Sequence, residues 1–226
     1  MDDAQFIVVG IAVLLVLVVL AVLASKALDR SYRARTAEWA AKHGWVYREG
    51  GGGPWCSQLD QGMKRGVKFQ LEGTRRGRHV LVAHWWFTTR ETEWVSGSGD
   101  EGWHWETRIK THLRMVVVVR LPVPCPDMRV EERGRGSRLG RSLGLRDPAA
   151  IGHDAFDRAF RIRAANPTVG RRLLTRQLVA AHLARRVPLW SVRGFDLVST
   201  WEGKVRADAI LPRVEVLLDV ADLLSL

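Results

Sequence analysis

The sequence has few cysteines and lacks the common motifs of catalytic sites. Only two of its 226 residues are cysteine, and they form no C-x-x-C pair, which excludes a disulfide-rich fold and a zinc ribbon. It contains no H-E-x-x-H, no G-x-S-x-G and no phosphate-binding loop that ends in Lys-Ser or Lys-Thr. We therefore predict no catalytic residue, no metal site and no cofactor, and we favour a non-enzymatic protein over an enzyme.

Charge is absent from one long segment near the start. The 19 residues from Phe6 to Ala24 carry no polar side chain. As a helix rising about 1.5 Å per residue they extend roughly 28 Å, close to the hydrocarbon thickness of a bilayer. A buried core helix and a cleavable signal peptide are the alternatives, but residues 1–5 are acidic where a signal peptide is basic. We expect a short acidic N-terminus over 1–5 and an uncleaved transmembrane helix over 6–24.

The flanks of this segment predict its orientation. No Lys or Arg precedes it, whereas Lys26, Arg30, Arg33 and Arg35 follow it. Because Lys and Arg near membrane ends stay on the cytoplasmic side, the N-terminus is expected outside and the following domain in the cytoplasm. Two unpaired cysteines suit that reducing compartment. The predicted location is the cell membrane, with a single span.

The rest of the chain predicts an α+β domain. Residues 25–43 continue as a juxtamembrane helix that ends at Gly44, and 45–226 form a central antiparallel sheet with two or three packed helices. Strands are expected at 45–48, 67–72, 78–89, 103–121, 127–131 and 160–164, with a hairpin about Gly194 joining 189–193 to 195–201. A short turn or helix is expected at 153–160, and helices are expected at 166–186 and 211–226. Prolines at 122, 124 and 126 are expected to end the long strand, because proline cannot donate to a ladder. Residues 134–145 predict a basic, glycine-rich loop.

Tryptophan is abundant in the predicted sheet, with ten in the chain. Along 103–115 apolar and charged residues alternate strictly, which predicts one buried and one solvated sheet face. The turn-rich residues 96–102 predict a hairpin that carries five tryptophans on neighbouring strands: Trp85, Trp86, Trp94, Trp103 and Trp105. These rings either fill the core or form an aromatic binding surface, and the pattern leaves both open.

The seven histidines are scattered singly. His104 and His112 are eight residues apart, roughly 26 Å along a strand, which is too far to share a metal ion. His84 lies among β-forming apolar residues and is expected in the core rather than as a ligand. A ligand-binding domain or enzyme that uses a Trp- and His-lined sheet face is the alternative. It would require a pocket that holds His84 or His112 beside an acid.

Positive charge dominates the later half of the chain, whose overall net charge is +11. Residues 158–193 contain nine arginines and no acid. Three explanations are open: a solvated surface balanced elsewhere, attraction to the anionic cytoplasmic leaflet, and nucleic-acid binding, which no recognition motif supports. The lipid-surface candidates are Arg158, Arg161, Arg163, Arg171, Arg172, Arg176, Arg185 and Arg186.

The same region resembles a family of uncharacterised bacterial proteins with an N-terminal membrane helix. The family pattern is F-x-x-x-F-x-V-x-A/S-x-D/N-P followed by a helix with L-L-x-x-x-L/M. The matching residues are Phe156, Phe160, Ile162, Ala164, Asn166, Pro167, Leu173, Leu174 and Leu178. Residues 38–45 (EWAAKHGW) are similar to a second family segment. The resemblance implies a domain of unknown function and no catalytic residue. With the charge pattern, it predicts a single-pass membrane protein whose domain acts in interaction or assembly at the cytoplasmic surface.

Overall fold

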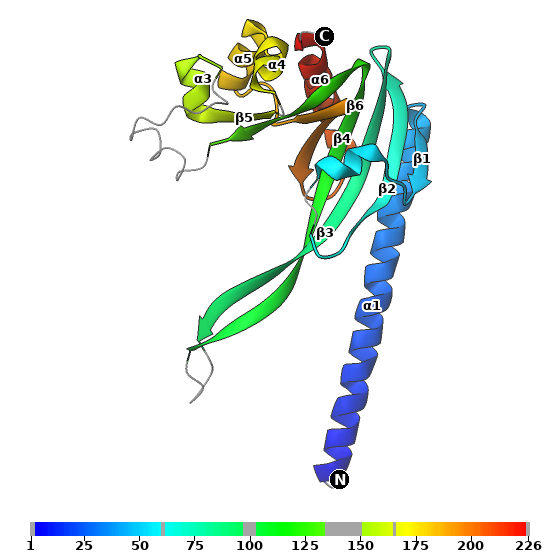
Figure 1. The fold of residues 1–226 in the computed structure, drawn as a ribbon. Coiled ribbons are helices and arrows are strands. Elements are labelled where there is room, and N and C mark those ends of the chain that lie inside the picture. The colour runs from blue at the N-terminus through cyan, green and yellow to red at the C-terminus, as the bar shows by residue number, and fades with distance from the viewer. Residues whose placement is uncertain (1–2, 60–61, 97–102, 134–150, 165, 225–226) are drawn as a thin grey trace. The chain divides into compact units, whose positions relative to one another are not determined.

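The computed structural model describes residues 3–59, 62–96, 103–133, 151–164 and 166–224 (Figure 1). The predicted loop at 134–145 and most of the turn at 96–102 lie outside these ranges. The chain divides into two compact units, Met1–Gly44 and Trp45–Leu226. The α+β class predicted from the sequence is confirmed, with a long apolar helix in the first unit and a mainly antiparallel sheet with short helices in the second.

The first unit is one continuous helix, α1 (Asp3–Lys42). Its stretch Ile11–Lys42 is long and apolar enough to cross a membrane, and no residue from Ile11 to Ala24 is buried in the structure. Past Ser25 the helix becomes polar, with ion pairs between Asp29 and Arg33 (2.8 Å) and between Glu38 and Lys42 (2.9 Å). These are one helical turn apart, the spacing at which side chains on a helix meet. The predicted helix over 25–43 is thus continuous with the apolar segment.

The second unit is built on a six-stranded antiparallel sheet. Its strands are β1 (Val46–Glu49), β2 (Arg65–Arg75), β3 (Arg78–Ser96), β4 (Trp103–Glu132), β5 (Phe160–Ala164) and β6 (Ser191–Glu202). Strands β1 to β4 are neighbours in sequence order, and β4 also pairs with β5 and β6. Since β4 is by far the longest, it connects the parts of this domain.

Helices cover both faces of the sheet. A 3-10 helix, η1 (Pro54–Gln58), packs on one face around Trp55 and Trp85. Helix α6 (Ala207–Leu223) covers the other, where its Arg213 lies over the Trp201 ring. Three short helices gather near β5: α3 (Asp154–Ala159), α4 (Pro167–Leu173) and α5 (Arg176–Leu183). The fully buried side chains of α6 show why its sequence is so apolar: Ile210, Val214, Leu217, Leu218 and Val220.

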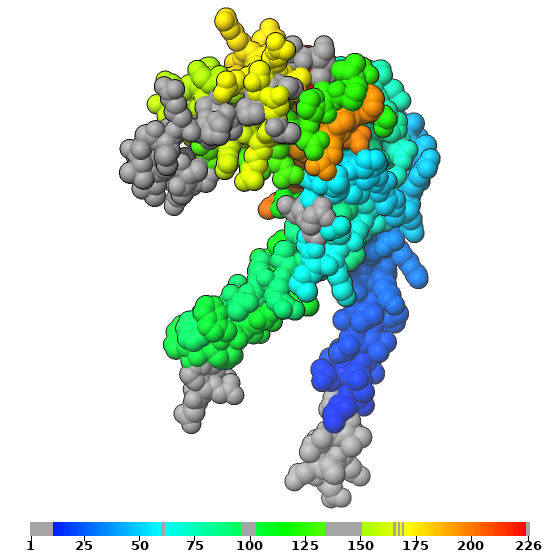
Figure 2. Space-filling model, viewed as in Figure 1, coloured from blue at the N-terminus to red at the C-terminus, as the bar shows by residue number. Residues whose placement is uncertain are grey.

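Strands β3 and β4 extend together beyond their other partners. Pairing of β2 with β3 stops at Phe87, and pairing of β6 with β4 stops at Arg114. Past these points 89–96 and 103–110 pair only with each other, from Thr89 opposite Lys110 to Ser96 opposite Trp103. We call this two-stranded ribbon the arm, and it stands out from the body of the domain (Figures 1 and 2).

Two predictions about strand ends were wrong. The prolines do not end β4, which runs through Pro122 and Pro124 to Glu132. Pairing with β3 ends at Val119 and pairing with β5 begins at Met128, so the prolines have no ladder to donate to on that edge. Gly194 does not turn a hairpin either, because β6 is one strand in which Gly194 sits in an irregular stretch opposite Cys125. Its φ of 57° fits a bulge as well as a turn.

The predicted helix over 166–186 is divided in two. Leu174 bridges to Leu224, and Thr175 then caps α5 by accepting a hydrogen bond from Leu178 N (3.1 Å). The Thr175 hydroxyl also donates to Leu223 O (2.8 Å). A threonine that caps a helix has non-helical backbone angles, so the chain breaks here and forms α4 and α5 separately.

Candidate functional site

The eight predicted lipid-surface arginines lie at the end of the domain formed by α3, β5, α4 and α5, which we call the arginine end. All eight are exposed. Arg161 and Arg163 alternate with buried residues on β5 and share one face of that strand. The other six are on the three helices or directly after α5: Arg158, Arg171, Arg172, Arg176, Arg185 and Arg186. The fold therefore brings the eight to one end of the domain, on a strand and on helices, rather than onto one helix face.

Some of these charges are neutralised locally. Arg163 pairs with Glu131 (2.8 Å), and Arg185 pairs directly with Glu132 while its guanidinium lies over the Phe160 ring. Within the described chain, five others form no ion pair: Arg158, Arg161, Arg172, Arg176 and Arg186. Arg158 and Arg172 occupy the last turns of α3 and α4, where positive charge also stabilises the helix. The arginine end thus carries an excess of exposed positive charge.

The buried carboxylate of Asp157 fixes the backbone of residues 151–153, directly before α3. The side chain of Asp157 accepts hydrogen bonds from the backbone N–H groups of Ile151 (3.0 Å), Gly152 (3.0 Å) and His153 (3.1 Å). His153 Nδ1 in turn caps α3 by accepting from Phe156 N (3.3 Å). Asp157 therefore stabilises the segment 151–153 through hydrogen bonds to its backbone.

His182 lies in the core beneath the arginine end. The Trp190 indole N–H donates to its Nε2 across 2.9 Å, and the rings of Phe156 and Phe160 pack around it. Burial, with a smaller contribution from the Arg185 charge, lowers the pKa of His182 to about 4. The ring is neutral at physiological pH and acts in packing.

The other singled-out histidines lie apart from one another. His84 is fully buried and packs edge-on against Phe69, as predicted for a core residue. His112 stacks on Phe87 and shares a hydrogen bond of 2.8 Å with the Thr89 hydroxyl. Its Nε2 is 3.9 Å from Glu91. Among the described residues, no group of three or more His, Cys, Asp or Glu side chains is placed to hold a metal ion.

A pocket of about 190 Å³ opens between η1, β4 and β6. Its lining includes Arg114, Arg129 and Trp190, and no histidine or cysteine. Its two serine hydroxyls are used by the fold, since Ser191 donates to Gln58 Oε1 (2.8 Å) and Ser199 donates to Leu189 O (2.6 Å). The pocket described here is therefore separate from the histidines that the alternative prediction requires.

Both cysteines are free thiols. Cys125 is buried and Cys56 half-buried, and burial raises the pKa of both. A raised pKa keeps a thiol protonated and poorly nucleophilic. Neither side chain has the environment of a reactive cysteine.

The tryptophans divide between core and surface. Trp45, Trp55, Trp85 and Trp190 are buried. On the arm, Trp94, Trp103, Trp105 and Ile109 are 50%, 62%, 65% and 67% exposed. The prediction that this strand has one buried face was wrong for the arm, because α6 packs on this side of β4 at Met115 and no described helix packs on it at 103–109. The alternation itself is present, but it does not show whether another layer covers the apolar side.

Comparison with known proteins gives a likeness of fold. No protein-family model matches the sequence, and no curated protein sequence matches it. The structure is similar to the crystal structure of the mycobacterial trehalose monomycolate transport factor A, TtfA, with a TM-score of 0.51 and 15% sequence identity. The match covers 86% of this chain and 94% of that chain. At this identity the likeness shows the fold. Of the predicted resemblance to a bacterial family, the comparisons support this structural similarity together with the N-terminal apolar helix.

Proposed function

We propose that this chain is a single-pass membrane-anchored accessory protein that acts through interactions at the membrane, as a partner in transport rather than as an enzyme. The observation that carries the proposal is the joining of an apolar helix, α1, to a domain with the TtfA fold. TtfA is named as a transport factor, and the match extends over nearly all of both chains.

In this proposal residues 6–24 span the bilayer, 25–43 form a juxtamembrane helix, and 45–226 form the interaction domain in the cytoplasm. The basic residues that follow the apolar segment support that orientation. The domain is then confined beside the anionic leaflet of the cytoplasmic membrane.

The arginine end docks on anionic lipid headgroups. Its five arginines without ion pairs in the described chain are exposed and close in the fold to three more. Each Lys or Arg near an anionic surface contributes about 1 kcal/mol to binding, and the attraction weakens within a Debye length of about 8–10 Å. Tethering by α1 raises the effective concentration of lipid around the domain. A few such contacts therefore suffice to bind the domain to the membrane surface.

The test uses the full chain reconstituted in nanodiscs of phosphatidylcholine, with or without phosphatidylglycerol. Hydrogen exchange is followed in peptides from 154–186. We expect anionic lipid to slow exchange in these peptides at low salt, and high salt to abolish the difference. Equal exchange in both kinds of disc would refute lipid docking.

A charge-matched pair of variants locates the contact. Replacing Arg172, Arg176 and Arg186 by Gln is expected to remove the protection given by anionic lipid. Replacing Arg48, Lys64 and Arg206 by Gln removes the same charge from exposed positions elsewhere and should leave the protection intact. If both variants lose the same protection, non-specific attraction between the net positive charge of the chain and the anionic lipid explains the slowed exchange. The arginine end would then not be the contact site.

A further inference from the structure

The arm is a two-faced ribbon. In an antiparallel pair, residues directly opposite each other point to the same side. Trp94 is opposite Trp105, Thr92 opposite Thr107 and Arg90 opposite Ile109, so these residues share one face with Trp103. The Trp94 and Trp105 rings lie 4.8 Å apart between centroids and form one continuous aromatic patch. We call this side the aromatic face.

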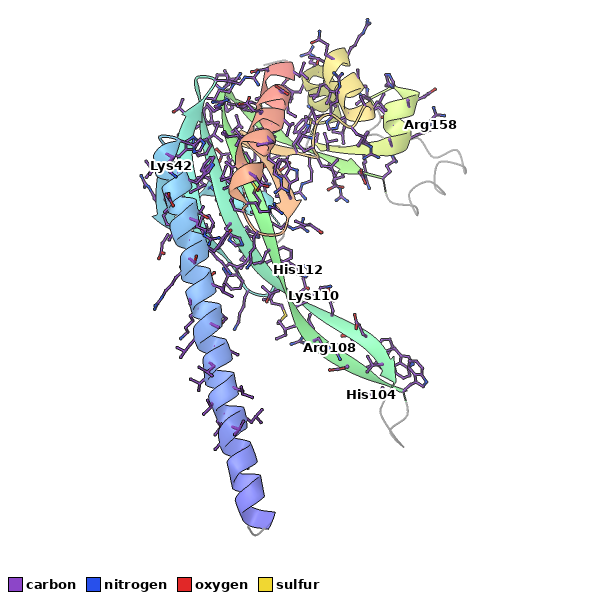
Figure 3. The ribbon with its side chains drawn as sticks, turned by 180° about the vertical axis from the view of Figure 1, so that it is seen from behind. Lys42, His104, Arg108, Lys110, His112 and Arg158 are labelled. Atoms are coloured by element: carbon purple, nitrogen blue, oxygen red, sulfur yellow. The ribbon has the colours of Figure 1, made fainter. Side chains whose placement is uncertain are left out.

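The other face of the arm is charged. It carries Glu91, Glu93, Glu106, Arg108 and Lys110. Lys110 pairs with Glu91 across the strands (3.2 Å), and Arg108 pairs with Glu106 along β4 (2.6 Å). His104, Arg108 and Lys110 are spaced along the arm in Figure 3. The ribbon is thus mainly aromatic on one side, with Arg90 opposite Ile109 at its base, and mainly charged on the other.

We propose that the aromatic face of the arm lies in the headgroup region of the membrane to which α1 anchors the chain. The inference rests on the anchoring proposed above. Trp is the residue that prefers the membrane–water interface, because its ring is apolar and its N–H needs a polar partner. Among the described residues no further strand pairs with either outer edge of the arm, and the headgroup region can hydrate such strand edges whereas the hydrocarbon core cannot. The arm therefore lies at the interface and does not span it.

A second copy of the chain is a poorer occupant of this face. With about 250 Å² for a whole Trp side chain, the exposed parts of the three rings and Ile109 amount to roughly 550 Å². Counting these four side chains alone, two arms packed face to face would bury roughly 1,100 Å², at the low end of the about 1,200–2,000 Å² of stable interfaces. A lipid surface has no such minimum area, since the anchor already supplies the encounter.

The arm contact is distinct from docking of the arginine end. The arm and β5 pair with opposite ends of β4, and Figure 3 shows His104 and Arg158 at opposite ends of the domain. The two contacts also differ in chemistry: apolar insertion into the interface depends little on salt or lipid charge, whereas the arginine contact depends on both.

The experiment places an environment-sensitive fluorophore on either face of the full chain, with one copy per nanodisc. Thr107→Cys labels the aromatic face, and Arg108→Cys, the next residue, labels the charged face; Cys56→Ser and Cys125→Ala remove the native thiols. The discs contain phosphatidylcholine with a spin-label quencher at headgroup depth. We expect several-fold stronger quenching at position 107 than at 108, unchanged by high salt and by added anionic lipid.

Equal quenching at the two positions would overturn the proposal, as would quenching at 107 that needs two copies per disc. Replacing Trp94, Trp103 and Trp105 by Thr, which keeps β propensity, should abolish quenching at 107 while the chain remains in the disc. If the chain does not remain in discs at all, the anchoring by α1 fails. Retention in the disc without quenching at 107 refutes the arm contact alone.

Discussion

The indole N–H of Trp190 donates a hydrogen bond to Nε2 of His182 across 2.9 Å in the core beneath the arginine end. Both side chains are about 99% buried. Because Nε2 accepts, the ring is neutral and cannot take a second proton there without losing this bond. The pair joins helix α5 to the start of β6, and through them it links the arginine end to the sheet.

This pair makes the stability of the domain sensitive to acid. Burial lowers the His182 pKa from 6.5 to about 4. Below pH 6.5 His182 is protonated in the unfolded chain, whereas in the folded domain it takes up a proton only near pH 4. The free energy of unfolding therefore falls as the pH drops from 6.5 to about 4, by about 3 kcal/mol for this residue. His182→Gln should reduce the fall measured by urea unfolding in detergent between pH 7 and 4.5. Exposed His79→Gln is the control, and equal slopes for the two variants would contradict the assignment.

Asp157 is expected to be more important for stability than its neighbour Asp154. Its carboxylate accepts three backbone hydrogen bonds, and bonds to a charged group are each worth about 1.5–3 kcal/mol. Asp157→Ala should cost about 3 kcal/mol, and Asp157→Asn less, because one oxygen remains. Asp154 is exposed in the first turn of α3, so Asp154→Ala should cost at most about 1 kcal/mol. Urea midpoints that match for the two alanine variants would disprove this role.

Gly73 is required by the closeness of Trp45. A Cβ at position 73 would lie 2.5 Å from the Trp45 ring, so Gly73→Ala should destabilise the domain by about 1–3 kcal/mol through overpacking. Trp45→Leu in the same chain should recover part of the loss in a double-mutant cycle. Gly77→Ala adds a methyl group at a φ of 72° with no atom within 4 Å, and its cost should not change with Trp45→Leu. The absence of coupling between positions 73 and 45 would argue against the contact.

Local pattern was sufficient to predict much of this fold. The apolar run, the helix that follows it, the strands on either side of 96–102 and the α3–β5 segment depend on nearby residues, and the structure has each of them. The prolines of β4, the bulge at Gly194 and the break at Thr175 depend on where distant strands and helices end. The exposure of the arm also depends on distant residues: alternation in 103–110 predicted an apolar face, but α6 packs on that side of β4 at Met115, beyond the arm.

The lipid-surface site stays a prediction. Its eight arginines were selected from charge alone, and the fold places them at one end of the domain. The ion pairs of Arg163 and Arg185 with acids of β4 could not be predicted, because Glu131 and Glu132 are far from them in sequence. The exposed aromatic face was one of two interpretations of the tryptophans, and it applies to the arm alone.

The orientation of the chain in the membrane tests the account most directly. Docking of the arginine end requires the domain to lie on the cytoplasmic side, beside the anionic leaflet. Two reporters fused after residue 226 of the full chain measure the orientation: an enzyme active only outside the cytoplasm, and a fluorescent protein that folds only inside. We predict fluorescence without enzyme activity. Enzyme activity without fluorescence would place the domain outside, contradict the assignment from flanking charge, and remove the cytoplasmic leaflet as the surface on which the arginine end docks.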